Sequence, residues 1–315
     1  MKKLFATAAV AAAAMAATLP ANASLLLTAA GIADGFTLST FASGGNPGSY
    51  PFLSAAALSD GTLAVIDFAN ERLVKYNDVD NQTQANALAS VAFSGAINIA
   101  NAGGITYAAS RTQGLFSVSS ALGLTAVSTP GLQFSLGLWG AANGHLIAAT
   151  TLGITDIDPL TGTHSVIAAV SADGVSVSPD GLTVYAEVGG AIQAYNLATH
   201  VAGANYNFGH SPDGTGVITG GALNGHIIAN NNDGTVVEID PTTGVATVIA
   251  NGGSRGDFAA ADSNDGSLLL SQFGEMIRLK IAGGVIGGGP LPEPASLALV
   301  GLALLGAGLA RRRVA

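Results

Sequence analysis

Apolar and small polar residues alternate through the middle of this 315-residue chain, whereas long apolar runs occur only near its two ends. Segments such as residues 62–68, 145–151 and 267–273 are each followed by a glycine-containing turn and a second alternating segment. Alternation with period two predicts half-buried β-strands, and the middle shows no apolar stripe of helical period. The pattern therefore predicts an all-β body.

One unit recurs along this body: a strand of small residues, an Asp-Gly, Asn-Gly or Gly-Gly turn, an apolar strand, a second turn and a third strand. The turns begin at residues 60, 103, 143, 180, 224 and 265, which are 43, 40, 37, 44 and 41 residues apart. A period near 40 without helices is typical of the four-stranded blades of a β-propeller. We therefore predict a six-bladed β-propeller over residues 24–282.

The sixth repeat ends at a glycine-rich segment and lacks an outer strand, because residues 276–282 are followed directly by Gly283 and Gly284. Residues 35–41 alternate in hydrophobicity and have no partner within their own repeat. We expect this N-terminal strand to complete the last blade and close the ring, which removes an exposed sheet edge. The repeats resemble those of NHL and YVTN-type propellers, most clearly at Ser178-Pro179-Asp180-Gly181 and the strand that follows. Propellers serve binding, hydrolysis and scaffolding, so the resemblance implies a fold and not a function.

The N-terminal apolar run has the features of a secretory signal peptide. Two lysines precede it, and Ala21-Asn22-Ala23 places small residues at both positions that signal peptidase reads, Ala21 and Ala23. We expect cleavage after Ala23, so residues 1–23 are removed during export by the Sec machinery.

The C-terminus has three parts in a fixed order. Pro292, Glu293 and Pro294 form a stiff extended segment, because each proline fixes its own φ and restricts the preceding residue. Residues 295–310 are uncharged and mostly apolar, enough for ~24 Å of helix against a hydrocarbon core of about 30 Å. Arg311, Arg312 and Arg313 then form a positive cluster that favours the cytoplasmic side. The pattern predicts a transmembrane helix held transiently in the inner membrane.

These three parts, over residues 291–315, resemble the PEP-CTERM sorting domain. The resemblance implies an exosortase as partner, cleavage at or near the Pro-Glu-Pro motif, and a Gram-negative bacterium that makes exopolysaccharide or biofilm. It also implies delivery to the cell surface or extracellular matrix. Residues 283–290, which contain five glycines, are expected to form a flexible tether between the body and this signal.

Charge excludes one class of function. The segments 1–23 and 291–315 hold five of the 11 basic residues and one of the 20 acidic residues, so the remainder holds six basic and 19 acidic residues and a net charge of −13. Nucleic-acid binding needs a basic surface that releases phosphate counterions, and this body has none. The absence of cysteine also excludes disulfides, thiol nucleophiles and thiolate metal sites.

No catalytic set stands out in the sequence. Residues 252–256 match G-x-S-x-G, but a strand follows where a nucleophile elbow needs a helix, so an inter-blade loop is predicted. His145 and His226 follow the same Asn-Gly turn in two repeats, and the two Asp-Pro-x-Thr-Gly segments at residues 158–162 and 240–244 recur likewise. Recurrence at one position of the repeat favours a structural role in each case.

We expect no obligatory cofactor, with Ca²⁺ in the axial channel as an alternative. Carboxylate and amide oxygens suit this hard cation. The candidate ligands are Asp60, Asn101, Asp173, Asn230, Asn231 and Asp262. Trp139, the single tryptophan, lies near the end of a first strand, where it either packs in the core or stacks on a sugar at the channel mouth.

Two functions remain open. The first is a non-enzymatic exported propeller that binds or scaffolds extracellular polysaccharide. The second is an extracellular hydrolase or lyase of the lactonase-like propeller class, acting on a sugar or lactone. The axial channel separates them: three or four convergent carboxylates or amides favour the enzyme, and a lining of Ala, Val and Ser favours the binder.

Overall fold

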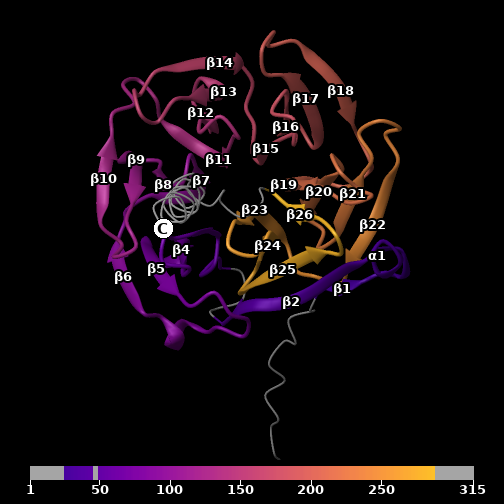
Figure 1. The fold of residues 1–315 in the computed structure, drawn as a ribbon, viewed down its shortest axis with the longest axis horizontal. Coiled ribbons are helices and arrows are strands. Elements are labelled where there is room, and N and C mark those ends of the chain that lie inside the picture. Colours follow the sequence, from indigo (N-terminus) through magenta and orange to yellow (C-terminus); the bar gives the residue numbers. More distant parts are fainter. Residues whose placement is uncertain (1–24, 45–48, 288–315) are drawn as a thin grey trace, which may run out of the picture.

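A computed structural model describes residues 25–44 and 49–287 of the chain. Six antiparallel sheets surround a central axis, and the described part is almost entirely β (Figure 1). The prediction of an all-β, six-bladed propeller is confirmed.

Each blade has an inner strand at the axis and three further strands in succession toward the rim. The first blade comprises β3 (Ser54–Ala57), β4 (Leu63–Asp67), β5 (Arg72–Tyr76) and β6 (Ala89–Ala92). The second comprises β7 (Ala96–Ala102), β8 (Ile105–Ser110), β9 (Gly114–Val118) and β10 (Leu124–Val127). The third comprises β11 (Phe134–Gly140), β12 (Leu146–Thr150), β13 (Gly153–Ile157) and β14 (His164–Ala168).

The other three blades continue the same order around the ring. The fourth comprises β15 (Val175–Val177), β16 (Thr183–Val188), β17 (Ala191–Asn196) and β18 (Ala202–Tyr206). The fifth comprises β19 (Pro212–Thr219), β20 (Ile227–Asn231), β21 (Val236–Ile239) and β22 (Ala246–Asn251), extended by β1 (Leu26–Leu27) outside β22 and by β26 (Val285–Ile286) beside β19. The sixth comprises β23 (Gly256–Asp262), β24 (Ser267–Gln272), β25 (Glu275–Ile281) and β2 (Phe36–Ser43).

In the part of the chain that the structure describes, three short helices accompany the strands. Helix α1 (Ala29–Ala33) lies beside β22, where Gly31 packs against the Ile249 carbonyl oxygen. The 3₁₀ turns η1 (Phe68–Asn70) and η2 (Gln84–Asn86) lie in the first blade's loops.

The ring is closed by the N-terminal strand, as predicted. β2 pairs with β25 from Phe36 opposite Ile281 to Ser43 opposite Glu275, with one irregularity between Thr40 and Ala42. Its Phe41 is fully buried between the last and first blades, where it meets Tyr76 edge-on. Burial of a phenylalanine contributes about 1.5–3 kcal/mol, so closure is stabilised by packing as well as by the sheet.

Glycines let the inner strands approach one another backbone to backbone. A Cβ on Gly137 would lie 2.3 Å from the Asp173 carbonyl oxygen, and one on Gly174 would lie 2.3 Å from that of Asp213. A Cβ on Gly214 would likewise lie 2.5 Å from that of Asp257. The small residues expected at the axis are therefore required by contact between successive blades, and they place three aspartates side by side around the axis.

Candidate functional site

The six inner strands all run in the same direction along the axis, because each blade repeats the same strand order. Their first residues therefore lie at one end of the channel and their last residues at the other. We call the first end the acidic mouth, formed by Asp173, Asp213, Asp257 and Glu187. We call the second the apolar mouth, formed by the cavity that Trp139, Leu138, Val177 and Ala260 line.

Three successive blades supply the aspartates of the acidic mouth. Asp173 precedes β15, and Asp213 and Asp257 are the second residues of β19 and β23. Glu187 lies on β16 beside them, since its backbone N–H donates to the Gly174 carbonyl oxygen. Four acids from different parts of the chain thus converge at one end of the axis.

Burial and neighbouring negative charge raise the pKa of two of the three aspartates, Asp173 and Asp257. Burial, followed by the charges of Asp213 and Asp257, raises the pKa of Asp173 from 3.8 to about 8. Burial and the charge of Asp213 raise that of Asp257 to about 6, although Arg255 opposes the shift. At neutral pH one carboxyl is therefore protonated beside another that is ionised, and Asp173 Oδ1 is buried without a hydrogen-bond partner.

Two further side chains border this mouth. Arg255 donates from Nη2 to Asp213 Oδ2 at 3.1 Å and from Nε to Asn232 Oδ1 at 2.5 Å. Tyr50 is buried, and burial together with the charge of Asp257 raises the pKa of its hydroxyl, which stays protonated. The mouth therefore offers a cation and a phenol beside its acids.

Only Asp173 of the six predicted cation ligands belongs to the acidic mouth. Asn230 uses its amide to donate to the backbone oxygens of Asp257 and Ser271, and Asn231 bonds within its own blade. Asp60 and Asn101 lie toward the opposite face, where Asp60 binds Lys75 and Asn101 donates to the Ala57 carbonyl. Asp213 and Asp257 were missed, although Asp173-Gly174 and Asp213-Gly214 repeat the same dipeptide at a strand start.

Asp262, the sixth predicted ligand, belongs to a separate cluster. Within the described residues, Asp78, Asp262 and Asp265 are the one trio of His, Cys or acidic side chains whose ligand atoms lie within 4.8 Å of one another. Arg278 already donates to all three, and to Asp80 at 3.0 Å. The guanidinium supplies the positive charge there and ties the last blade to the loop after β5.

The acidic mouth does not bring three acidic oxygens within that distance of one another. Its geometry therefore does not fit a cation bound by three carboxylates.

The motifs expected to be structural have structural contacts. His145 lies 2.8 Å from Asp156, and His226 binds Glu238 at the equivalent place in the fifth blade. Asp158 and Asp240 each accept hydrogen bonds from the turn that they begin, and Gly162 and Gly244 close those turns with positive φ. Residues 252–256 form the predicted inter-blade connection, in which Ser254 accepts from the Phe273 N–H.

The apolar mouth is a cavity of about 660 Å³. Trp139 is 5% exposed, so it packs in the core and also forms part of the cavity wall. Alanine, valine and glycine supply most of the remaining lining, with Asn101, Ser178, Thr219 and Ser263 as polar groups.

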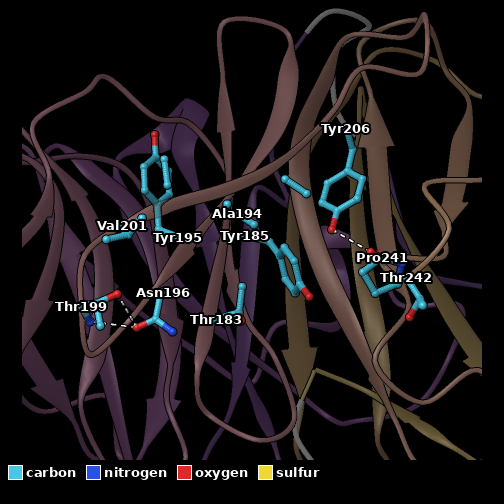
Figure 2. Close-up of a pocket in the computed structure, with 13 residues that line it drawn as sticks. Thr183, Tyr185, Ala194, Tyr195, Asn196, Thr199, Val201, Tyr206, Pro241 and Thr242 are labelled. Carbon is cyan, nitrogen blue, oxygen red and sulfur yellow. Dashed lines mark hydrogen bonds between the residues drawn. The ribbon is translucent and has the colours of Figure 1, made fainter.

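A second cavity of about 650 Å³ lies on the side of the propeller between the fourth and fifth blades (Figure 2). Tyr185 and Tyr206 lie edge-to-face in its wall, and the Tyr206 hydroxyl donates to the Pro241 carbonyl at 3.0 Å. Asn196, Thr199 and Thr242 add polar groups. This pocket could not be predicted from the sequence, because it depends on how two blades meet.

Solved structures of the same fold are numerous. A gluconolactonase from Xanthomonas campestris is 13% identical with a TM-score of 0.61, over 82% of this chain and 94% of that one. Regucalcin from Agrobacterium tumefaciens, described as calcium-binding, is 18% identical with a TM-score of 0.56, over 81% of this chain and 99% of that one. A streptogramin B lyase is 14% identical with a TM-score of 0.52, over 78% of this chain and 98% of that one. At such identities the likeness concerns the fold alone, and no curated protein matches the sequence.

The expected signal-peptidase residues, Ala21 and Ala23, and the sorting residues Pro292, Glu293, Pro294 and Arg311–Arg313 lie outside the described residues. Among the described residues, no helix is long and apolar enough to span a membrane. The predicted span at residues 295–310 lies outside the described residues. The sequence of residues 290–313 matches the model of the PEP-CTERM protein-sorting motif. The chain is thus a six-bladed propeller followed by a PEP-CTERM sorting motif, which indicates an exported substrate of an exosortase.

Proposed function

We propose that this chain is an exported hydrolase of a sugar lactone, sorted by an exosortase to the cell surface or polysaccharide matrix. The observation that carries the proposal is the convergence of Asp173, Asp213 and Asp257 at one mouth of the channel. Convergent carboxylates are the feature expected of the enzyme and not of the binder. The gluconolactonase fold supports the substrate class.

The two shifted aspartates suit an acid–base pair. Neighbouring carboxyls whose pKa values lie on either side of neutrality can act as acid and base. Asp257, ionised at pH 7, takes a proton from water, and the resulting hydroxide bonds to the lactone carbonyl carbon. The ring C–O bond then breaks, and Asp173 gives its proton to the leaving oxygen. Transfer of the proton from Asp257 to Asp173 restores the starting state.

The remaining residues of the mouth position the substrate. Arg255 is partly exposed and donates toward the mouth, so its guanidinium can bind the hydroxyls or carbonyl of a sugar lactone. The protonated Tyr50 hydroxyl offers a second donor, a neutral one, beside Asp257.

Hydrolysis of a panel of sugar lactones, followed by chromatography of the acid products, tests this function. We expect Asp257→Asn and Asp173→Asn to lower the rate by a factor of about 10²–10⁴. Asp180→Asn, in an exposed turn at the other face, is the matched control and should keep the wild-type rate. The proposal fails if the wild-type chain is no faster than Asp257→Asn on every lactone.

A polysaccharide-binding propeller is the second candidate. The apolar mouth and the side pocket favour it, because Trp139 and the tyrosine pair offer aromatic surface beside hydroxyl and amide groups. Retention of an inactive Asp257→Asn chain on extracted exopolysaccharide, lost in Tyr185→Ala, would support this candidate.

We also propose that the C-terminal signal is held in the inner membrane and then cut. Pro292, Glu293 and Pro294 are the expected recognition motif, residues 295–310 the membrane span and Arg311–Arg313 the cytoplasmic end. Fractionation of wild type against a chain lacking residues 290–315, with mass spectrometry of the mature C-terminus, tests this. A mature protein that keeps its full tail, at an unchanged location, contradicts it.

A further inference from the structure

Glu187 belongs to the acidic mouth but has no part in the hydrolysis proposed above. It lies near the end of β16, where its backbone N–H donates to the Gly174 carbonyl at 2.8 Å. The Asp173 N–H donates to the Glu187 carbonyl at 3.2 Å, so the two residues lie side by side just before β15 begins. The fold therefore places a further carboxyl group next to the proposed acid.

The Glu187 carboxyl is held in place without a cation. Its Oε1 accepts from the Gly190 N–H at 2.7 Å, in the turn between β16 and β17. Burial raises the pKa of this carboxyl, the Gly190 hydrogen bond lowers it, and the charge of Asp213 raises it again. Within the described part of the chain, no arginine, lysine or histidine forms an ion pair with it.

The cation of the mouth, Arg255, is bound elsewhere. It donates to Asp213 Oδ2 and to Asn232 Oδ1. Even with Asp173 protonated, the mouth therefore holds more acidic than basic side chains. Such a site repels a ligand that carries a carboxylate or phosphate and attracts one that carries positive charge.

Two oxygen atoms at this mouth are buried without a hydrogen-bond partner among the described residues, the Tyr50 hydroxyl and Asp173 Oδ1. Tyr50 is 8% exposed, and its ring centroid lies 4.8 Å from that of Phe273. Its hydroxyl is close enough to Asp257 for the charge of that carboxylate to raise the pKa of the phenol. Buried polar atoms are normally paired, so these two indicate a place for donors that a ligand supplies.

An ammonium group has the properties that the mouth lacks. It carries a positive charge and three N–H donors, and it needs no donor in return. The half-buried Phe273 adds aromatic surface against which a sugar ring can pack. A sugar with an amino group therefore complements both the charge and the unpaired oxygens.

We propose that the substrate of the acidic mouth is the lactone of an amino sugar, whose ammonium group binds Glu187. This assignment rests on the hydrolase function proposed above and narrows its substrate class. Glu187 determines specificity, because it binds a part of the substrate that does not react. Asp173 and Asp257 carry out the hydrolysis.

Three matched aldonolactones test the substrate class. They differ at one ring carbon, not adjacent to the carbonyl, which carries a hydroxyl, an amino or an acetamido group. The acetamido group keeps the nitrogen and removes its charge. We expect kcat/KM at neutral pH and low salt to be about tenfold higher, or more, for the amino lactone than for the other two. The preference should decrease as salt is added.

Two variants locate the ammonium site. Glu187→Gln keeps an oxygen for the Gly190 N–H and removes the charge, so it should abolish most of the preference. Glu71→Gln makes the same change at an exposed residue that bonds Ser94, and it should keep the preference. Melting temperatures show whether both variants are folded. If Glu187→Gln does not fold, the wild-type comparison of the amino and acetamido lactones decides.

The outcomes separate this assignment from the hydrolase itself. A wild-type chain that hydrolyses the amino lactone no faster than the hydroxyl lactone overturns the substrate class, and a preference that Glu187→Gln retains overturns the role of Glu187. A chain that hydrolyses none of the three overturns the hydrolase. Titration calorimetry with 3-amino-3-deoxyglucose against glucose then decides on the ammonium site: tighter binding of the amino sugar, lost in Glu187→Gln, supports it, and equal binding overturns it.

Discussion

The two mouths of one channel have opposite chemistry, although the same six strands form both. At the strand starts, Asp173, Asp213 and Asp257 lie close together, and burial with neighbouring charge raises the pKa of Asp173 and of Asp257. At the strand ends, Trp139, Val177 and Ala260 line an apolar cavity, and Gly287, the last described residue, is part of its lining. The difference shows that a propeller can place acidic side chains at one end of its channel and an apolar cavity at the other without changing its repeat.

The largest expected effect comes from the glycines that bring the aspartates together. A Cβ on Gly214 would lie 2.4 Å from the Ala259 nitrogen, so Gly214→Ala should cost about 3 kcal/mol or more, or prevent folding. Gly203→Ala, with no contact under 3.6 Å, is the control. Thermal denaturation by circular dichroism measures both. Equal melting temperatures would mean that the strands are not packed so closely.

The next effect concerns the apolar mouth. Trp139→Ala should lower the free energy of unfolding by about 3–5 kcal/mol, because it removes the largest side chain of the cavity wall. Trp139→Phe should cost much less. Lactone hydrolysis by the folded fraction should be unchanged in both. A change in hydrolysis that exceeds the loss of folded protein would show that catalysis needs both mouths.

A smaller effect is expected from pH. Folded Asp173 keeps a proton that the unfolded chain releases above about pH 4, so raising the pH toward 8 lowers stability through this group. Asp173→Asn should therefore raise the melting temperature at pH 8 and change it little at pH 4. A variant that follows the wild-type curve at both pH values would contradict the shifted pKa.

For the fluorescence of Trp139 we expect no change with pH. Trp139 is the only tryptophan and lies at the other end of the channel from Asp173, so its emission should stay constant as the acidic mouth titrates. An emission shift between pH 6 and 9 that disappears in Asp173→Asn would show that the two mouths are coupled.

The sequence predicted the blades better than the site. The turns repeat once in each blade, so the number of blades could be predicted from local pattern. The strand at residues 35–41 had no partner in its own repeat, and the sixth blade lacked an outer strand, so ring closure could be predicted in the same way. The acidic mouth depends on which residues face the axis at strand starts. Asp213 lies inside an ordinary-looking Pro-Asp-Gly turn signal, and Asp257 follows a glycine-rich loop.

The prediction that Asn230 and Asn231 are cation ligands was not confirmed, for a related reason. Asn230 and Asn231 have the composition of a cation site, but their amides satisfy backbone carbonyls in a close-packed region. The two residues of β26 could not be predicted either, since two apolar residues between glycines carry no pattern.

The pairing of β2 with β25 also constrains the order in which the ring can form. A chain exported from its N-terminus delivers β2 first and its partner last, with more than 200 residues between them. The ring cannot close until residue 281 has crossed, and such distant pairing is slow to form. In a chain exported from its N-terminus, the last blade would lack its outer strand pairing until β25 has crossed. Closure then comes only a few residues before the sorting motif, at residues 290–313, reaches the membrane.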